Sequence, residues 1–454
     1  MIFGNGIGPT GSQAVADALQ RQLAANPNDR IARHNLAVEL RKLCRSDAGL
    51  IEIQHAWRQG LRAAETAVVL GNLLADAGQF DEAVEAYREA VRINPELLEP
   101  HHILASLLPQ LGRGDEALDS LHEALARVPQ AGPIWVTALE TARLHRRFDQ
   151  LLEWCEAAHA RWGEDPLIEA FKASALSGLG RNIEAIALLD RITSREPAQP
   201  NIHATRAHVL LQLGDPKGAE MAAETALQLA PMSQAAWSLL SVAWRLLDDQ
   251  REYWLCGYED LVMTVDIGVE PGLKGALEQR HAVSAHPADQ SLRGGTQTRG
   301  NLFETADPQI LELAFKLRDA VEARIARLPR DAAHPFAGRN SGSVSFPTSW
   351  SVRLRSEGHH VSHIHPVGWM SSAYYVSLPP EVAEGEGQGA LTFGVPDVAL
   401  GLDLPPRRIV QPVEGRLVLF PSYLWHGTTP FSSSEPRVTV AFDTLPVDNG
   451  AAPR

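Results

Sequence analysis

Three histidines in the last quarter of the chain have the spacing of a metal site. His363 and His365 flank one residue in the segment GHHVSHIHPVGWM. If this segment is a strand, alternate side chains share a face, so both imidazoles can bind one ion. Pro366 favours an extended backbone at His365. His426, after another predicted strand and a turn, completes a facial set of three ligands with open coordination positions opposite.

The residue types leave the identity of the metal open. Imidazoles are borderline ligands that favour iron, and zinc, copper and nickel are also compatible with them. We expect His359 and His360, just before the pair, to lie at the surface or behind the ligands. Arg437 lies on the strand predicted after His426 and brings a cation to the same region.

Short alternating segments predict the scaffold that positions these residues. Gly, Pro and aromatic residues gather after about residue 250, and short strands separated by turns are typical of a sandwich or barrel. An amphipathic helix is predicted over 307–328, with Asp307 as its N-cap. The predicted strands are 342–355, 360–366, 371–378, 390–394, 415–420 and 437–443.

The N-terminal half has a different pattern, a repeat with a period of about 34 residues. Small residues recur in two registers, so that paired helices can approach closely. A proline or glycine follows each second helix, and a glycine marks the turn within most repeats. Examples are the alanines Ala56, Ala90 and Ala124, the turn glycines Gly78, Gly112, Gly180 and Gly214, and the prolines Pro95, Pro129, Pro197 and Pro231.

The clearest copy, residues 64–95, resembles the tetratricopeptide repeat. The resemblance covers roughly residues 30–250, or about six repeats. It implies a curved α-solenoid whose concave groove binds a protein or peptide partner. The residues that match the motif are Leu70, Gly71, Gly78, Phe80, Ala83, Tyr87, Ala90 and Pro95.

The C-terminal half resembles the double-stranded β-helix oxygenases that use Fe(II) and 2-oxoglutarate, most closely a bacterial group in which such a domain follows tetratricopeptide repeats. That family carries H-x-D/E, a distal His, and a later Arg or Lys for the far carboxylate of 2-oxoglutarate. His363, His365, His426 and Arg437 take these positions. The resemblance implies a dioxygenase that uses Fe(II), 2-oxoglutarate and O2, usually to hydroxylate its substrate. Tyr375 matches the second of two tyrosines in prolyl hydroxylases and would bind the same carboxylate.

One departure from the family pattern concerns the third ligand. His365 stands where a carboxylate is usual, and a three-histidine set is similar to that of cupin dioxygenases, which act without 2-oxoglutarate. The spacing of Gly415, Pro421 and His426 is also close to a cupin motif, although Arg437 would then have no assigned role. Alternatively, His365 lies behind the metal and a carboxylate comes from elsewhere, with Glu357, Glu384 and Asp397 as candidates.

Four further residues are candidates for substrate contact. The polar, glycine-rich segment 285–307 is expected to be a loop, and its part 291–298 could line the site with Arg293 and Gln297. Arg353 could face either the barrel interior or solvent, and Trp369 could serve as a substrate platform or as part of the core.

Composition limits the remaining possibilities. The 454 residues have a net charge of −14, which disfavours nucleic acid and anionic membrane surfaces as partners. Three separated cysteines argue against a disulfide framework, and we expect a cytoplasmic protein without membrane segments.

The sequence thus predicts a multi-domain α + β protein. We expect an all-α tetratricopeptide solenoid in 1–249, a linker and entry loop in 250–306, and a double-stranded β-helix (jelly-roll) oxygenase domain with a flanking helix in 307–454. Two alternatives remain: a cupin-type dioxygenase without 2-oxoglutarate, and a non-catalytic tetratricopeptide adaptor.

Overall fold

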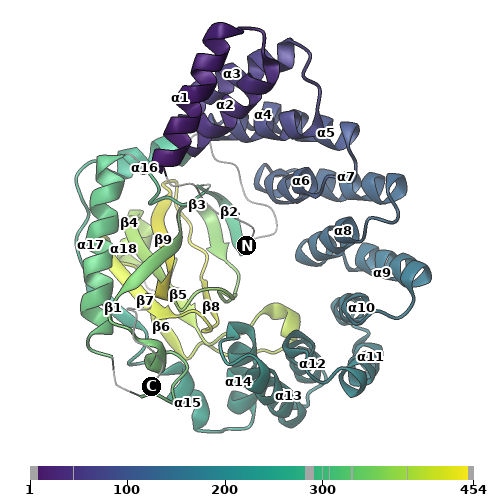
Figure 1. Cartoon of the computed structure of the whole chain (residues 1–454). Coiled ribbons are helices and arrows are strands. Elements are labelled where there is room, and N and C mark those ends of the chain that lie inside the picture. The colour runs from purple at the N-terminus through teal and green to yellow at the C-terminus, as the bar shows by residue number, and fades with distance from the viewer. Residues whose placement is uncertain are drawn as a thin grey trace. The chain divides into compact units, whose positions relative to one another are not determined.

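The computed structural model describes residues 9–43, 45–281, 291–298, 300–305, 307–328, 331–385 and 387–447. The chain forms two compact units, 1–145 and 146–454. The first contains paired helices, and the second contains further helices followed by two β-sheets (Figure 1). The expected fold class, a helical repeat array followed by an antiparallel β domain, is therefore confirmed.

Helices of the first unit approach closely at the small residues of the repeat. A Cβ atom at Gly71 would lie 2.5 Å from the ring of Tyr87, so only glycine fits there. The Tyr87 hydroxyl donates to Asn72 Oδ1 at 2.9 Å, and Ala83 and Ala90 are fully buried. The helices are α1 (Pro9–Ala25), α2 (Arg30–Lys42), α3 (Ser46–Arg58), α4 (Ala64–Asp76), α5 (Phe80–Ile93), α6 (Leu98–Gln110), α7 (Gly114–Arg127) and α8 (Gly132–Leu144).

From residue 78 to residue 248, a residue with positive φ recurs every 34 residues, at the turn inside each repeat. At the predicted turn glycines φ is 74° or 75°. Two turns carry other residues in the same conformation, Arg146 with φ 55° and Asp248 with φ 53°. Left-handed backbone is costly for such residues, so these two turns store strain that the glycine turns avoid. Among the described residues, the series is Gly78, Gly112, Arg146, Gly180, Gly214 and Asp248.

The helices of the second unit continue the repeats and then surround the sheets. The helix predicted over 307–328 is α17 (Pro308–Ile325), and the Asp307 side chain accepts the N–H groups of Gln309 and Ile310 as its N-cap. The other helices are α9 (Phe148–Trp162), α10 (Pro166–Gly178), α11 (Asn182–Arg195), α12 (Pro200–Gln212), α13 (Pro216–Leu229), α14 (Gln234–Leu246), α15 (Arg251–Cys256), α16 (Leu273–His281), α18 (Pro380–Glu384) and the 3-10 helices η1 (Ala337–Arg339) and η2 (Val398–Leu400).

The strands form two antiparallel sheets. The larger has the order β1-β7-β4-β9-β3-β2, and the smaller has the order β6-β5-β8. Their bounds are β1 (Met263–Asp266), β2 (Leu292–Gln297), β3 (Val344–His360), β4 (Met370–Ser377), β5 (Leu391–Phe393), β6 (Arg408–Val410), β7 (Arg416–Pro421), β8 (His426–Thr428) and β9 (Arg437–Pro446).

The segment 250–306, expected to be a linker and loop, supplies both edge strands of the larger sheet. β1 pairs with β7, and β2 pairs with β3. The glycines of SLRGGTQT suggested a loop, but Gly294 has φ 68° at a shift in the register of β2, where it interrupts the strand without ending it. Part of the expected loop, 285–290 with 299 and 306, lies outside the described residues.

The second unit has one continuous apolar core. Leu240 and Trp244 on α14 belong to the same cluster as Leu317 on α17 and Phe393 and Phe442 in the sheets. The last repeats therefore pack in the same unit as the β domain. The domain boundary after residue 249 remains a prediction about independent folding.

Candidate metal centre

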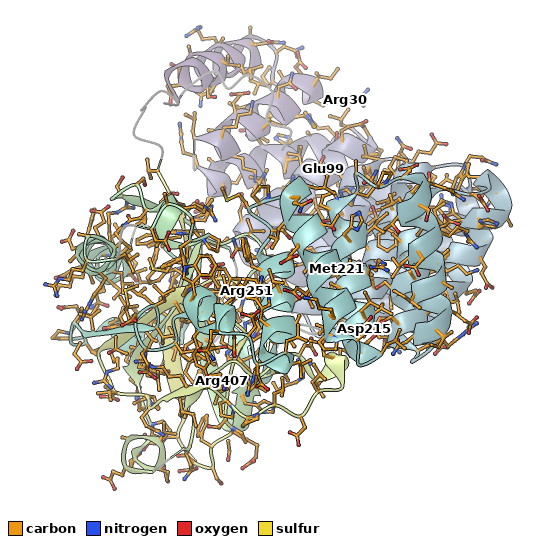
Figure 2. All side chains as sticks on the ribbon, turned by 90° about the horizontal axis from the view of Figure 1, so that it is seen from below. Arg30, Glu99, Asp215, Met221, Arg251 and Arg407 are labelled. Atoms are coloured by element: carbon orange, nitrogen blue, oxygen red, sulfur yellow. The ribbon has the colours of Figure 1, made fainter. Side chains whose placement is uncertain are left out.

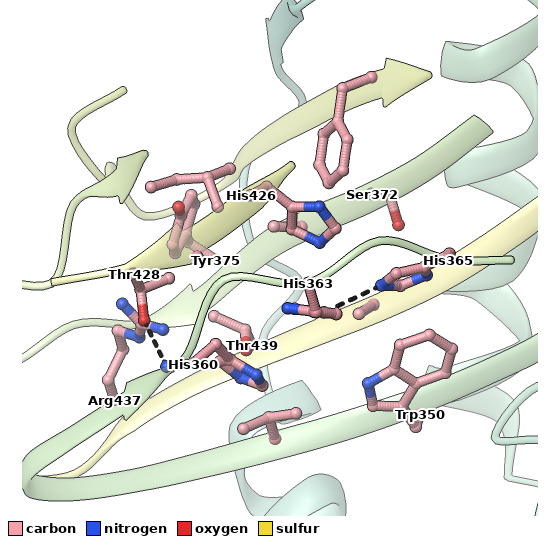
Figure 3. A pocket seen from close by; sticks show the side chains of 16 residues that line it. Trp350, His360, His363, His365, Ser372, Tyr375, His426, Thr428, Arg437 and Thr439 are labelled. Atoms are coloured by element: carbon pink, nitrogen blue, oxygen red, sulfur yellow. Dashed lines mark hydrogen bonds between the residues drawn. The ribbon is translucent and has the colours of Figure 1, made fainter. Parts of the chain in front are cut away.

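The three predicted histidines converge in one pocket of the second unit (Figure 3). His363, His365 and His426 each offer a ring nitrogen, and these atoms all lie within 4.8 Å of one another. The Nε2 atoms of His363 and His365 are 3.2 Å apart. The ring centroids of His363 and His426 are 4.2 Å apart, and those of His365 and His426 are 5.0 Å apart. Such a cluster is suited to one metal ion with three imidazole ligands.

The other nitrogen of each ring has its own partner. Nδ1 of His363 lies 2.9 Å from the carbonyl oxygen of Val361, and Nδ1 of His426 lies 2.9 Å from that of Leu424. Because carbonyl oxygens only accept, the tautomer that makes both bonds carries its proton on Nδ1. Both Nε2 atoms then keep a free lone pair for a metal ion.

His365 is oriented by a carboxylate. Its Nδ1 atom lies 2.6 Å from Oδ1 of Asp443, which also accepts the hydroxyl of Ser371 at 2.7 Å. A carboxylate behind a ligand histidine fixes the orientation of the ring and increases its basicity. Burial raises the pKa of Asp443, but the charge of His365 and hydrogen bonds from His365, Ser371 and Thr348 outweigh it, so the pKa is lowered.

The backbone around the pair differs from the expected strand over 360–366. β3 ends at His360, and only His363 in the following segment makes a bridge, with His426. His363 N–H donates to the His426 carbonyl at 2.9 Å, and the reverse bond is 3.0 Å. His365 N–H donates to the Ser422 carbonyl at 3.0 Å. Pro366 has no N–H, so the ladder cannot continue, but both imidazoles still reach the same site.

Burial favours the neutral form of His363 and His426, which is the form that binds a metal ion. Burial, followed by the charge of His365, lowers the pKa of His363 to about 3. Burial also lowers the pKa of His426 well below its ordinary value.

Arg437 and Tyr375 line the same pocket as the histidines. Both side chains are buried, and Arg437 Nη1 donates to the Gly389 carbonyl at 2.6 Å. Within the described residues, Nε of Arg437 and the hydroxyl of Tyr375 have no hydrogen-bond partner, and no carboxylate pairs with the guanidinium. Burial lowers the pKa of Arg437, which the Tyr375 phenol counteracts. A buried cation without an anion is costly, so this end of the pocket is suited to an anionic ligand.

The neighbouring residues Tyr374 and Tyr375 on β4 face opposite sides of the sheet. The Tyr374 hydroxyl donates to the Gly268 carbonyl at 2.5 Å, whereas Tyr375 faces the pocket. Trp350 also lines the pocket, with its ring centroid 5.8 Å from that of His365 (Figure 3). Other lining residues include Val352, Leu391, Phe420 and Ala441, so much of the wall is apolar.

His360 is closer to the site than a surface residue would be. It lines the pocket, and its ring centroid is 6.0 Å from that of His363. The Ser291 hydroxyl lies 3.0 Å from His360 Nδ1 and 3.3 Å from His363 Nε2.

None of the four candidates for substrate contact lines the pocket in the described structure. Arg353 lies on the face of β3 opposite Trp350 and Val352, because strand side chains alternate. Gln297 is paired with Val352 and shares its face, whereas Arg293 is exposed. Trp369 belongs to the core: it is 1% exposed, stacks on Phe336 and donates to the Phe336 carbonyl at 3.0 Å.

The three alternative carboxylates also lie away from the pocket lining. Glu357 and Glu384 are exposed. Asp397 caps η2 by accepting the Ala399 N–H at 2.8 Å and lies 3.9 Å from Arg146.

Asp443 is the functional candidate that the sequence analysis missed. It is six residues after Arg437 on β9, and Arg437, Thr439 and Ala441 all line the pocket. Counting by two from Arg437 reaches Asp443, so strand alternation carried the signal.

Two family models match parts of the chain. Residues 348–443 match the family described as "Putative 2OG-Fe(II) oxygenase", and residues 71–112 match a TPR repeat. The chain thus combines a tetratricopeptide repeat with a domain of this oxygenase family. The matched segment includes the three histidines, and the family implies Fe(II), 2-oxoglutarate and O2.

Solved structures similar to this chain include tetratricopeptide-repeat proteins. One from Parabacteroides merdae is 16% identical, covers 51% of this chain and 91% of that one, and has a TM-score of 0.34. YrrB, a TPR protein with an unusual peptide-binding site, is 17% identical and has a TM-score of 0.30. The match covers 49% of this chain and 96% of YrrB. Yeast Tom70 is 17% identical and has a TM-score of 0.33. The match covers 54% of this chain and 60% of Tom70. No curated protein matches the chain. Every helix among the described residues is too short or too polar to cross a bilayer.

Proposed function

We propose that the chain is an Fe(II)- and 2-oxoglutarate-dependent oxygenase that hydroxylates its substrate. Its metal ligands would be the Nε2 atoms of His363, His365 and His426. The observation that carries the proposal is the combination, in one pocket, of three converging imidazoles, Arg437 and Tyr375. Among the described residues, the Arg437 guanidinium has no carboxylate partner and the Tyr375 hydroxyl has no hydrogen-bond partner.

Each of these groups has a defined task. Arg437 would bind the far carboxylate of 2-oxoglutarate through charge-assisted hydrogen bonds, and Tyr375 would donate to the same carboxylate. The apolar wall around Trp350 and Val352 would limit access of water to the metal. Bound iron would supply the oxidising chemistry that couples O2 and decarboxylation of 2-oxoglutarate to succinate with oxidation of a substrate C–H bond.

We also propose that the third ligand is His365 rather than a carboxylate. Support comes from the hydrogen bond between His365 and Asp443. Asp443 contacts Nδ1 of His365, which leaves Nε2 for the metal ion. The pocket lining includes His365 and none of Glu357, Glu384 and Asp397.

A cupin-type dioxygenase that does not use 2-oxoglutarate is the second candidate, because three histidine ligands favour it. Arg437 argues against it, because this buried cation has no carboxylate partner among the described residues and such an enzyme would have no use for a cation there. For the helical repeats, we propose that their concave groove binds a protein or peptide, in keeping with the general role of such repeats in protein interactions.

Anaerobic titration of the full chain with Fe(II) and 2-oxoglutarate tests the main proposal. We expect the metal-to-ligand charge-transfer band that 2-oxoglutarate gives when it chelates Fe(II). Release of succinate in air should then depend on both compounds. Iron binding without this band would favour the cupin-type alternative, and absence of iron binding would favour a non-catalytic adaptor.

A further inference from the structure

A buried arginine of the last long repeat helix holds the backbone of the β domain. Arg245 on α14 is 9% exposed. Its Nη1 atom donates to the Gly394 carbonyl at 2.6 Å, and its Nη2 atom donates to the Pro405 carbonyl at 2.7 Å. No carboxylate pairs with Arg245 in the described part of the chain, so its bonds to Gly394 and Pro405 compensate the burial of its charge.

The two carbonyl groups lie at the start and near the end of the loop that joins β5 to β6. The middle of this loop, η2, lies beside α12 (Figure 1), where Gln212 Nε2 donates to the Ala399 carbonyl at 2.7 Å. At the end of the β5–β6 loop, Arg407 pairs with Glu252 of α15 at 2.6 Å (Arg407 is labelled in Figure 2). Arg245 donates a hydrogen bond to each of these two carbonyl groups, so it helps to fix how the loop leaves and re-enters the smaller sheet.

The first end of this loop is bonded to the neighbours of two metal-ligand candidates. Gly394 N–H donates to the carbonyl of Trp425, the residue directly before His426, at 2.9 Å. Ser362, the residue directly before His363, donates its hydroxyl to the Val395 carbonyl. The group that Arg245 holds therefore lies next to the segments that carry His363 and His426.

A second contact strengthens this connection. Trp425 Nε1 donates to the Ser238 carbonyl of α14 at 3.1 Å. The backbones of His363 and His426 are bonded to each other, and a Cβ atom at Gly427 would lie 2.9 Å from the His360 carbonyl. Close packing of this kind transmits a displacement of one segment to the other.

We propose that Arg245 is a positioning residue of the metal centre, and that the solenoid helix α14 thereby sets the separation of His363 and His426. The proposal rests on the proposed function only in taking these histidines as metal ligands. A purely structural role for Arg245 would stabilise the junction of helix and sheet without affecting metal affinity.

The test compares Arg245→Met with Arg206→Met in the full chain. Arg206 is a matched control because it pairs with Asp190 within the repeats, at 2.7 Å. Co(II) binding is measured by absorption titration, and amide hydrogen exchange of His363 and His426 is measured without metal. For Arg245→Met we expect the Kd of Co(II) to rise about tenfold or more, as for other residues that orient metal ligands, and both amides to exchange faster. Arg206→Met should match the parent protein in both measurements.

Lower thermal stability of Arg245→Met with unchanged Co(II) affinity and unchanged exchange would overturn the proposal. If Arg245→Met does not fold, Arg245→Lys and Ser362→Ala replace it. Lysine reaches one carbonyl only, and Ser362→Ala removes only the bond to Val395. Both should weaken Co(II) binding to a smaller degree, and parent-like binding by both would contradict the proposal. A parent protein that binds Co(II) but not 2-oxoglutarate would refute the oxygenase proposal and leave this one standing, whereas a parent that binds no Co(II) would refute both.

Discussion

Nδ1 of His365 lies 2.6 Å from Oδ1 of Asp443, so a carboxylate is present at this site but contacts a proposed metal ligand instead of the proposed metal position. The pattern of the 2-oxoglutarate oxygenases that this site resembles has a carboxylate at the position of His365 itself. Here the negative charge acts through the imidazole, which becomes a stronger electron donor when its N–H is bonded to a carboxylate.

Asp443→Asn should weaken Fe(II) binding. The amide removes the charge and can present N–H instead of an acceptor to His365, so the ring loses its orientation. We expect Fe(II) affinity to fall about 10- to 100-fold, measured by anaerobic calorimetry. Asp266→Asn is a suitable control, because Asp266 lies on the edge strand β1 and pairs with Arg416 of β7 at 2.7 Å. Equal affinity in both variants would show that Asp443 does not support the metal.

His365→Asp should bind iron poorly in the presence of Asp443. The new carboxylate would lie near an existing one without an imidazole N–H between them, and like charges at short range repel. His365→Asp combined with Asp443→Asn should recover much of the affinity. The measurement is Fe(II) binding by the two single variants and the double variant. Additive losses in the double variant would contradict the assigned contact.

Alanine at each of the three histidines should nearly abolish Fe(II) binding. Each change removes one metal ligand, whereas His360→Ala leaves the ligand set complete and should retain most of the affinity. Alanine variants of Glu357, Glu384 and Asp397 serve as further controls. If His365→Ala binds iron like the parent while one of these three does not, a carboxylate is the third ligand.

Arg437→Gln should lower the affinity for 2-oxoglutarate by about 1.5–3 kcal/mol, the contribution of a hydrogen bond to a charged group. Tyr375→Phe should cost about 0.5–1.5 kcal/mol, because it removes a neutral donor. Fe(II) affinity should persist in both variants. Arg353→Gln is the matched control, since Arg353 is on the opposite face of the sheet from the pocket. The charge-transfer band gives each dissociation constant, and unchanged values for Arg437→Gln would favour the cupin-type enzyme.

Asp248→Gly should stabilise the protein by about 0.5 kcal/mol, because it relieves a left-handed backbone at an exposed turn. Gly214→Ala, at the same position of the preceding repeat, should destabilise it by about 1 kcal/mol. A Cβ atom at Gly214 has no neighbour within 4 Å, so backbone conformation alone sets the difference. Denaturant unfolding measures both changes, and the same sign for both would contradict the explanation.

The sequence was sufficient where a period or spacing determines geometry. The repeat period located the turn glycines, and H-x-H with His426 identified the cluster of imidazoles. The strand over 360–366 was predicted too regular, yet both side chains reach the site, because two local backbone bonds at His363 and His365 replace the ladder.

Predictions from residue type were wrong where the same type of residue can have several structural roles. Trp369 is large enough for a substrate platform but packs on Phe336, and the glycines of 291–298 accompany a strand instead of a loop. The bond from Arg245 to Gly394 spans 149 residues, and no local pattern encodes it. Contacts of this kind depend on how separate elements pack, which only the folded chain determines.

The apolar core shared by α14 and the sheets has a consequence for cooperativity. Repeat arrays usually unfold in a graded way, since each repeat contacts only its neighbours. In the second unit, Leu240 and Trp244 belong to one core cluster with residues of the preceding repeat helices and with residues of the sheets, so the end of the array packs with the β domain. Loss of the sheets would expose the end of the array, and loss of α14 would expose the sheets. Helix α14 and the β domain should therefore unfold together as one cooperative unit, while the repeats nearer the N-terminus can open on their own.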